Sequence, residues 1–216
     1  MPPNVLHDKP GYSWFDALGP VGPRCASGIR KIGVGDFEKR LCSKSPAGQT
    51  IVSIGSNDQW DFEIEAVRLG YKVHTFDCTI SWSYDRPGHP SHFPDQLSHS
   101  LKFYPFCIGS SDYTSGGLVF KSWPNLLKAA GLESTNLLKM DIEGYEYGVL
   151  ESMMKAPAHL HPQQVAVELH LVTQMTGLPW FGRAKQPSEV SNWMKMMASN
   201  GYMLLDRHDN PNCPHC

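Results

Sequence analysis

The stretch NLLKMDIEGYEYGVLE, residues 136–151, joins an apolar run to two acids, a glycine and a segment of helical spacing. The run LLKM predicts a buried strand, and the segment from Gly144 onward predicts a helix. Asp141 and Glu143 stand between these elements, although a strand-to-helix corner needs only one polar cap. We therefore expect a ligand to bind at this corner.

Short apolar runs alternate with helical patterns along the chain from residue 49 onward. The predicted strands are 50–55, 71–77, 101–109, 135–141, 163–170 and 202–208, and the predicted helices are 58–69, 122–132, 144–155 and 187–201. Strands that alternate with helices of about a dozen residues indicate βαβ units. The expected fold class is α/β, with a doubly wound, mainly parallel sheet. Pro105 predicts an edge or a bulge in the third strand.

The composition favours one domain preceded by a lead-in. Residues 1–48 are rich in Gly and Pro and predict a coil-like lead-in or short cap, whereas 49–216 predict one domain. The formal charge of −2 and the lack of a Lys/Arg run give no electrostatic case for nucleic acid. No apolar stretch reaches the roughly 18 residues of a membrane helix, and the first residues lack a signal-peptide pattern.

The six cysteines leave several interpretations open. Four are scattered, and two form a terminal CPHC: Cys25, Cys42, Cys78, Cys107, Cys213 and Cys216. A CxxC is found in redox pairs and in halves of zinc sites, but a zinc site wants a second ligand pair. A structural disulfide or free thiols are the favoured interpretation. The even count leaves an oxidising compartment open.

The turn after the first strand and the end of the second predict a nucleoside-containing ligand. Ligands of doubly wound sheets bind outside the carboxyl ends of the strands, where strand order reverses. The turn Gly55, Ser56, Asn57, Asp58 has one glycine rather than G-x-G-x-x-G, which argues against an NAD-dependent enzyme. It suits a ligand with an amino acid moiety and a nucleoside. Asp77 is predicted to accept hydrogen bonds from the ribose hydroxyls; its alternative is a solvated strand-end acid.

The stretch CIGSSD, residues 107–112, follows the third strand and is predicted to lie over an adenine. Ile108 would supply apolar contact and Asp112 an acceptor for the exocyclic amine. The alternative is a plain Gly/Ser turn.

Four ionisable side chains are expected to converge at one end of the sheet. Asp141 and Glu143 are two residues apart, as are Glu168 and His170, so each pair lies on one side of its strand. The fourth and fifth strands are expected to be neighbours. The alternative, in which Glu143 caps the helix and Asp141 is solvated, leaves the second pair unexplained.

Several stretches of the sequence resemble those of a known family. LLKMDIEGYEYGVLE is similar to the K-x-D-x-E-G-x-E signature of FkbM-type S-adenosylmethionine-dependent methyltransferases. VSIGSNDQWDFE, VHTFDCT and DNPNCPHC resemble blocks of a eukaryotic methyltransferase-like branch, the Methyltransf_22 type. The resemblance implies a class I, Rossmann-like methyltransferase fold and O-methyl transfer from S-adenosylmethionine to a sugar or another hydroxylated small molecule or glycan.

The resemblance also implies site roles and a compartment. It assigns the methionine part of the cofactor to Gly55, Ser56, Asn57 and Asp58, the ribose to Asp77, the sulfonium to Asp141, and the acceptor side to Glu143, Glu168 and His170. Relatives of the branch are often anchored secretory-pathway proteins, which implies the Golgi lumen or secretion and paired cysteines; a cytoplasmic protein is the alternative. The family usually continues past the CxxC into a last strand, which implies two alternatives: either that strand is missing here, or the predicted strand 202–208 ends the sheet alone.

The expected chemistry centres on the acceptor hydroxyl. His170 is the first choice for its base, because imidazole titrates near neutral pH; a structural histidine is the alternative. Asp141, Glu168 and His170 are also the ligand set expected for Mg²⁺ or Mn²⁺, if a cation lowers the acceptor's pKa.

Two loops and one different function class complete the expectations. His89 and His92 belong to an acceptor-side lid or are solvated, and residues 173–188 are expected to shape acceptor choice. A non-catalytic binding or regulatory protein on a degenerate methyltransferase fold is the alternative function. The intact acids at the strand ends argue against it.

Overall fold

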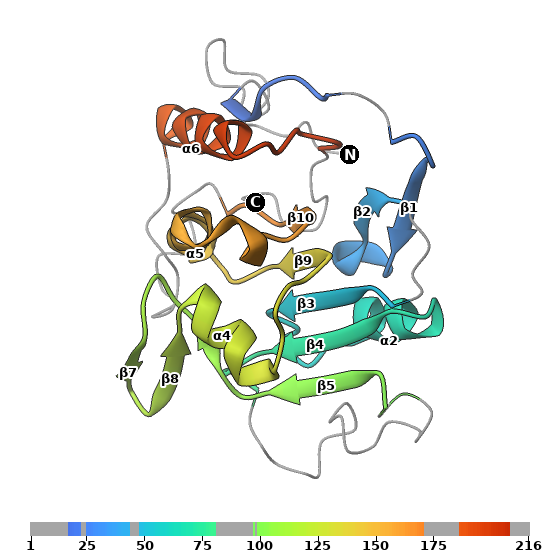
Figure 1. Ribbon diagram of the computed structural model, residues 1–216, viewed down its shortest axis with the longest axis vertical. Coiled ribbons are helices and arrows are strands. Elements are labelled where there is room, and N and C mark those ends of the chain that lie inside the picture. Colours follow the sequence, from blue (N-terminus) through green and yellow to red (C-terminus); the bar gives the residue numbers. More distant parts are fainter. Residues whose placement is uncertain are drawn as a thin grey trace, which may run out of the picture.

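The computed structural model describes residues 17–22, 25–43, 48–80, 97, 99–170 and 186–207 of the 216-residue chain. Its centre is a five-stranded sheet in the order β10-β9-β3-β4-β5, with every neighbouring pair parallel. These strands are β3 (Thr50–Ile54), β4 (Lys72–Phe76), β5 (Leu101–Tyr104), β9 (Leu137–Met140) and β10 (Gln164–Val167) (Figure 1). The predicted α/β class with a mainly parallel sheet is confirmed. The doubly wound description stays a prediction.

Strand order reverses beside β3. The chain runs from β3 to β4 and β5 on one side and then returns to β9 and β10 on the other. The carboxyl ends of β3 and β9 therefore form the switch point, which is where ligands of open α/β sheets bind.

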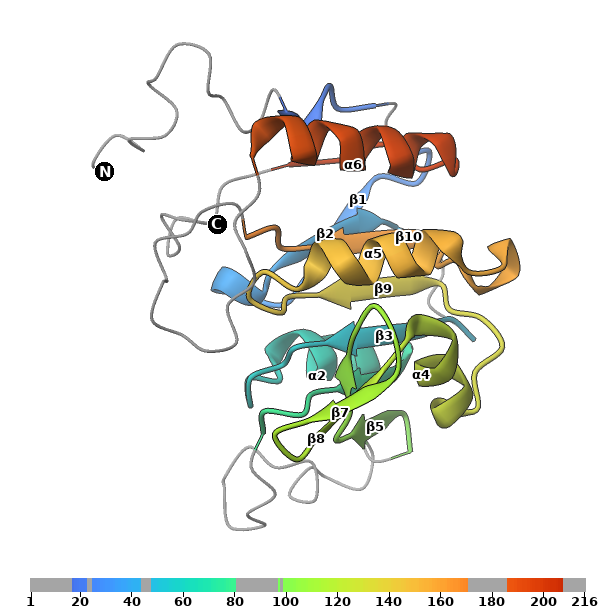
Figure 2. The ribbon, with the colours of Figure 1, turned by 90° about the vertical axis from the view of Figure 1, so that its left-hand side faces the viewer.

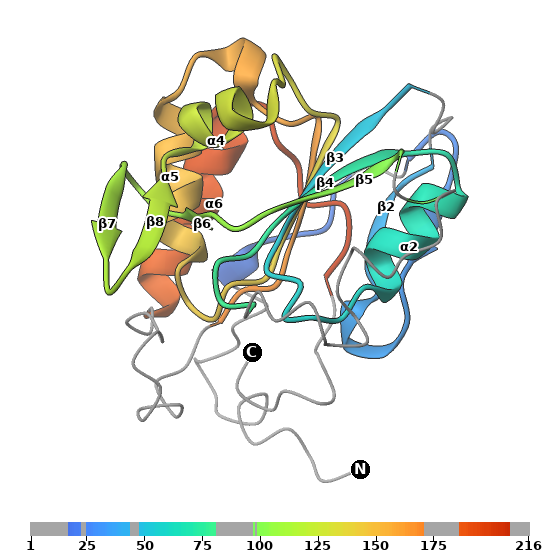
Figure 3. The ribbon, with the colours of Figure 1, turned by 90° about the horizontal axis from the view of Figure 1, so that it is seen from below.

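Both faces of the sheet are covered (Figure 3). The helices α4 (Trp123–Ala130), α5 (Glu146–Lys155) and α6 (Pro187–Ser199) follow one another along one face (Figure 2), and α2 (Asp61–Arg68) lies on the other. Adjacent strand residues enter opposite cores: Ile51 packs with the α2 cluster and Val52 with the α4–α6 cluster. Burial on both faces explains the largely apolar sequences of the central strands β3 and β9.

The predicted lead-in contains a β-hairpin. The strands β1 (Ile29–Ile32) and β2 (Lys39–Cys42) pair antiparallel, and Ile32 and Leu41 are buried in the core on the α2 face. The backbone N–H of Cys42 also donates to Gln164 Oε1 at 2.7 Å, which ties β2 to β10. Residues 29–32 and 39–42 are therefore strands rather than coil, and the alternative of a short cap stays a prediction. The domain boundary at residue 48 stays a prediction.

The third predicted strand, 101–109, divides at Pro105. Its first part is β5, an edge strand as the proline predicted, and its second part is β6 (Cys107–Ile108). A second, three-stranded sheet joins β6 to β8 (Leu118–Lys121) and β7 (Tyr113–Ser115) in the order β6-β8-β7. We did not predict the β7–β8 hairpin.

The predicted strand 202–208 is wrong over its described part, because residues 202–207 form no strand. This segment is held by one backbone hydrogen bond with Gly22 and by an ion pair with Arg40, rather than by pairing in a sheet. The backbone N–H of Gly22 donates to Leu204 O at 2.6 Å, and Arg40 Nη1 lies 3.0 Å from Asp206 Oδ2. Backbone and side-chain contacts therefore attach the segment to the domain, while Met203 stays exposed.

Two disulfides join Cys25 to Cys42 and Cys78 to Cys107. Cys213, Cys216, His89, His92 and residues 173–185 of the predicted acceptor loop lie outside the described residues. Within the described ranges, every helix is too short or too polar to cross a membrane.

Candidate active site at the carboxyl ends of the strands

The turn after β3 is built from left-handed backbone. Gly55, Asn57 and Asp58 have φ values of +77°, +46° and +60°. A Cβ on Gly55 would lie 1.7 Å from the backbone oxygen of Asp141, so only glycine fits there. The buried ammonium of Lys139, on β9, donates to Gly55 O. The ends of β3 and β9 are thus in direct contact.

Asp77 follows β4 and holds this turn. It is 6% exposed, and its Oδ2 accepts the backbone N–H groups of Ser56 at 3.0 Å and Asn57 at 2.8 Å. Its Oδ1 accepts the N–H of Thr79 at 2.9 Å and the hydroxyl of Thr79 at 2.6 Å. The chain itself therefore uses about four acceptor positions of this carboxylate. The ribose role stays a prediction.

The residues predicted to lie over an adenine make other contacts. Ile108 is 4% exposed and belongs to the core on the α4–α6 face. Asp112 accepts the N–H and the hydroxyl of Ser122, each at 2.6 Å, and Asn125 Nδ2 at 2.8 Å, at the start of α4. The Ser122 hydrogen bonds lower the pKa of Asp112. Contact of either residue with a ligand stays a prediction.

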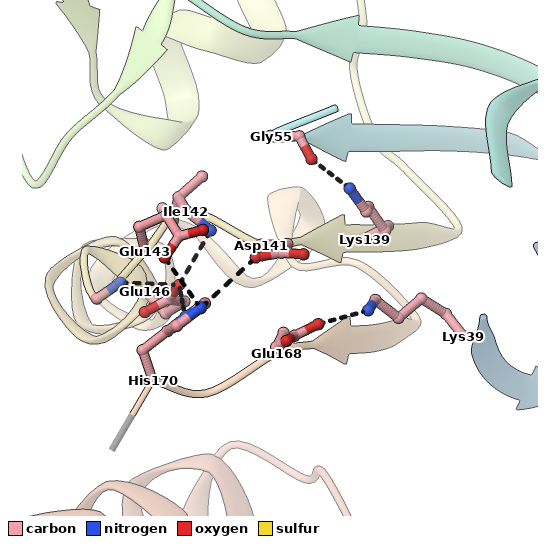
Figure 4. A network of polar contacts seen from close by, with 10 residues as sticks. Lys39, Gly55, Lys139, Asp141, Ile142, Glu143, Glu146, Glu168 and His170 are labelled. Atoms are coloured by element: carbon pink, nitrogen blue, oxygen red, sulfur yellow. Dashed lines mark hydrogen bonds and ion pairs between the residues drawn. The ribbon is translucent and has the colours of Figure 1, made fainter. Parts of the chain in front are cut away.

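The structure brings the four predicted ionisable side chains together beyond β9 and β10 (Figure 4). His170 Nε2 lies 3.9 Å from Asp141 Oδ1 and 3.4 Å from Glu143 Oε2. The ligand atoms of Asp141, Glu168 and His170 all lie within 4.8 Å of one another. Glu143 itself has a left-handed φ of +55°, a conformation that residues other than glycine rarely adopt.

The cluster shifts two pKa values. Burial of His170 opposes its charged form, but the hydrogen bond with Glu146 and the charges of Glu146, Asp141 and Glu143 outweigh it and raise its pKa to about 9. Burial and the charge of Glu168 raise the pKa of Asp141 to about 6, against the opposing effect of nearby cations. At neutral pH these shifts favour a protonated His170 and an ionised Asp141, with Nε2 and Oδ1 3.9 Å apart.

Sequence reasoning missed Glu146. This first residue of α5 is 0% exposed, and its Oε1 accepts the backbone N–H groups of Ile142 at 3.0 Å and Gly144 at 3.2 Å. The same oxygen contacts His170 Nδ1 at 2.9 Å. Glu146 is the last acid of the K-x-D-x-E-G-x-E pattern, so the motif contained the signal.

Two buried lysines were also missed. Lys39 Nζ, from β2, lies 2.9 Å from Glu168 Oε2, and the two side chains are 8% and 12% exposed. Lys139 lies on β9 behind the turn and opposes the burial that raises the pKa of Glu63, a buried acid bonded to the Ser53 hydroxyl. Lys139 belongs to the motif, whereas nothing in the sequence around Lys39 predicts its contact.

One family comparison bears on this site. Residues 124–204 match the family model described as the methyltransferase FkbM domain. The match supports an FkbM-type methyltransferase family. It spans α4 to α6, with the whole acid–histidine cluster, and leaves out the turn after β3. The eukaryotic branch stays a prediction, and no curated protein matches the chain.

Proposed function

We propose that this protein is an S-adenosylmethionine-dependent methyltransferase that methylates a hydroxyl oxygen of a small molecule or glycan. One observation carries the proposal. The cluster of Asp141, Glu143, Glu168 and His170 adjoins the Gly55 turn at the switch point, within the segment that matches the FkbM family model. A sulfonium methyl donor is already activated, so the enzyme needs alignment and a proton acceptor for the hydroxyl.

The cofactor-binding part of the proposal rests on Asp77 and the turn that it holds. Asp77 Oδ2 supports the turn, whereas Oδ1 accepts the backbone N–H and the hydroxyl of Thr79. We propose that the ribose hydroxyls exchange with Thr79 at Oδ1. Ser56 adds a buried hydroxyl that has no hydrogen-bond partner within the described residues, and buried hydroxyls are usually bonded. Asp141 would face the methyl donor from the end of β9.

On the acceptor side, the Asp141 carboxylate would take the hydroxyl proton, because a raised pKa of about 9 keeps the His170 ring protonated at neutral pH. Asp141 has a raised pKa of about 6, which makes it a stronger base than an ordinary aspartate. The protonated His170 ring would then stabilise the developing negative charge on the oxygen. Glu143 and Glu168 would line the space for the acceptor.

A divalent cation is the alternative use of the same side chains. Asp141, Glu168 and His170 offer two carboxylates and an imidazole close enough to share one ion. Lys39 already neutralises Glu168, so a cation would have to displace that ammonium. When bound, a cation would lower the pKa of the acceptor hydroxyl.

The proposed location is the lumen of the secretory pathway or the outside of the cell. The disulfides Cys25–Cys42 and Cys78–Cys107 support it, because disulfides persist mainly in oxidising compartments.

The direct test is transfer of a labelled methyl group from S-adenosylmethionine to a panel of sugars, glycans and other hydroxylated compounds. We expect turnover by the wild type and a loss of about 10²-fold or more in Asp141→Asn and His170→Gln. Glu151→Gln, an exposed change on α5, is the matched control. Turnover that EDTA abolishes and Mg²⁺ restores would select the cation alternative. Equal turnover in all variants would contradict the proposal.

A ligand comparison tests Asp77 separately. The 2′,3′-dideoxy analogue of S-adenosylhomocysteine should bind the wild type more weakly than the parent compound. Asp77→Ala should bind both compounds equally weakly if the ribose contacts Oδ1. If the wild type and Asp77→Ala both prefer S-adenosylhomocysteine over the dideoxy analogue by the same factor, Asp77 only supports the turn.

A further inference from the structure

Glu146 occupies an unusual position beneath the site. It is 0% exposed, yet it is a carboxylate at the first helical residue of α5. A buried charge is costly unless it is paired and hydrogen-bonded. Here one oxygen, Oε1, accepts from two backbone N–H groups of the turn before α5 and contacts His170 Nδ1. The helix N-terminus adds further stabilisation for a negative charge.

The hydrogen bond sets which nitrogen of His170 faces the site. A carboxylate accepts but does not donate, so Nδ1 must carry the proton in the 2.9 Å contact with Glu146. Nε2 is then the nitrogen directed at Asp141 and Glu143 (Figure 4). Glu143 is 41% exposed at its side chain and Asp141 18%, so this side of the ring is the one nearer to solvent.

Glu146 also links the ring to the shape of the turn. Its backbone donors, Ile142 and Gly144, flank Glu143, which has a left-handed φ. Glu146 Oε1 therefore holds the turn that carries Glu143, and it also holds the His170 ring, whose Nε2 lies next to the Glu143 carboxylate. A group that served only as a helix cap would not need the contact with His170.

We infer that Glu146 is a positioning residue: it holds His170 with Nδ1 protonated and bonded to Glu146, so that the Nε2 edge of the ring faces the acceptor and stabilises the charge that develops on its oxygen. This inference rests on the proposed methyl transfer. Glu146 itself would touch neither the acceptor nor the methyl donor.

The test uses Glu146→Gln, which keeps an oxygen for the backbone donors and removes the charge that holds His170. Glu151→Gln on the exposed side of the same helix is the matched control. We expect kcat to fall by about 10–100-fold in Glu146→Gln, with KM for S-adenosylmethionine and affinity for S-adenosylhomocysteine unchanged. A kcat within about threefold of the wild type would show that Glu146 only supports the turn.

A spectroscopic readout separates this inference from the proposed function. In ¹H–¹⁵N spectra of the imidazoles, with His170 assigned through His170→Gln, the wild type should show a hydrogen-bonded Nδ1 proton at low field. That resonance should move upfield in Glu146→Gln and stay in place in Glu151→Gln. A wild-type ring without the Nδ1 proton would overturn the inference, even if the Gln variant did not fold. Absence of methyl transfer together with the expected spectrum would refute the proposed function and leave the positioning intact.

Discussion

The contact between the ends of β3 and β9 leads to a quantitative prediction for Gly55→Ala. An alanine with φ near +77° is strained by about 1–2 kcal/mol, because its Cβ crowds the following carbonyl. The Cβ would also lie 1.7 Å from Asp141 O, and because such contacts are not found below 3.0 Å, the two backbones must separate by roughly 1.3 Å. Overpacking of this kind costs a further 1–3 kcal/mol or so.

Gly131→Ala is the matched control, because Gly131 has a similar φ of +69° but its Cβ would meet nothing within 4 Å. We expect a loss of about 1–2 kcal/mol for the control and about 2–5 kcal/mol for Gly55→Ala. In a chain of this size each kcal/mol lowers Tm by roughly 2–4 °C. Thermal unfolding followed by circular dichroism measures the difference. Equal shifts in Tm for the two variants would refute the contact between the strand ends.

Three further predictions concern other buried groups. Burial and nearby lysines lower the pKa of His74 to about 4 from 6.5, so its contribution to stability is present above pH 6.5 and is lost as pH falls through 4. Between pH 7 and pH 4, the free energy of unfolding should therefore fall further in the wild type than in His74→Gln. The two decreases, measured by denaturant titration, should differ by at most about 3 kcal/mol. Lys39→Met should lower the free energy of unfolding by about 3 kcal/mol, because it leaves Glu168 charged and largely buried; an unchanged value would exclude the ion pair. Cys78 directly follows Asp77 and is joined to Cys107, so loss of this disulfide should weaken the binding of S-adenosylhomocysteine. An unchanged calorimetric affinity in Cys78→Ser/Cys107→Ser would contradict this.

The sequence allowed prediction of the parallel sheet because its strands are buried on both faces. The apolar run LLKM and the β-branched run TIVSI indicate strands; an acid marks the end of the first run and a glycine the end of the second. The strand predicted at 202–208 failed for a physical reason: apolar content shows that a segment is packed, but it cannot show that a neighbouring strand has a free edge. Contacts of Leu204 and Asp206 with distant residues hold that segment instead.

The same limit applies to the site. Convergence of Asp141 and His170 follows from the parallel pairing of β9 and β10, because both residues lie just beyond the carboxyl ends of these strands. The i, i+2 spacing does not explain it, because β9 ends at Met140 and β10 at Val167. The partner of Glu168 could not be predicted in this way, because Lys39 is 129 residues away in the sequence. Lys39 also belongs to a hairpin that we did not predict, since the first 48 residues are rich in Gly and Pro. The raised pKa of His170 likewise depends on Glu146, whose role appears only once α5 is placed.

The most direct test of the central claim is calorimetric titration of the wild type with S-adenosylmethionine and S-adenosylhomocysteine, repeated on Asp77→Ala. The account predicts dissociation constants in the micromolar range for the wild type, about −8 kcal/mol, and loss of binding in a variant that still unfolds cooperatively. Absence of binding by the folded wild type would contradict the proposed methyltransferase function.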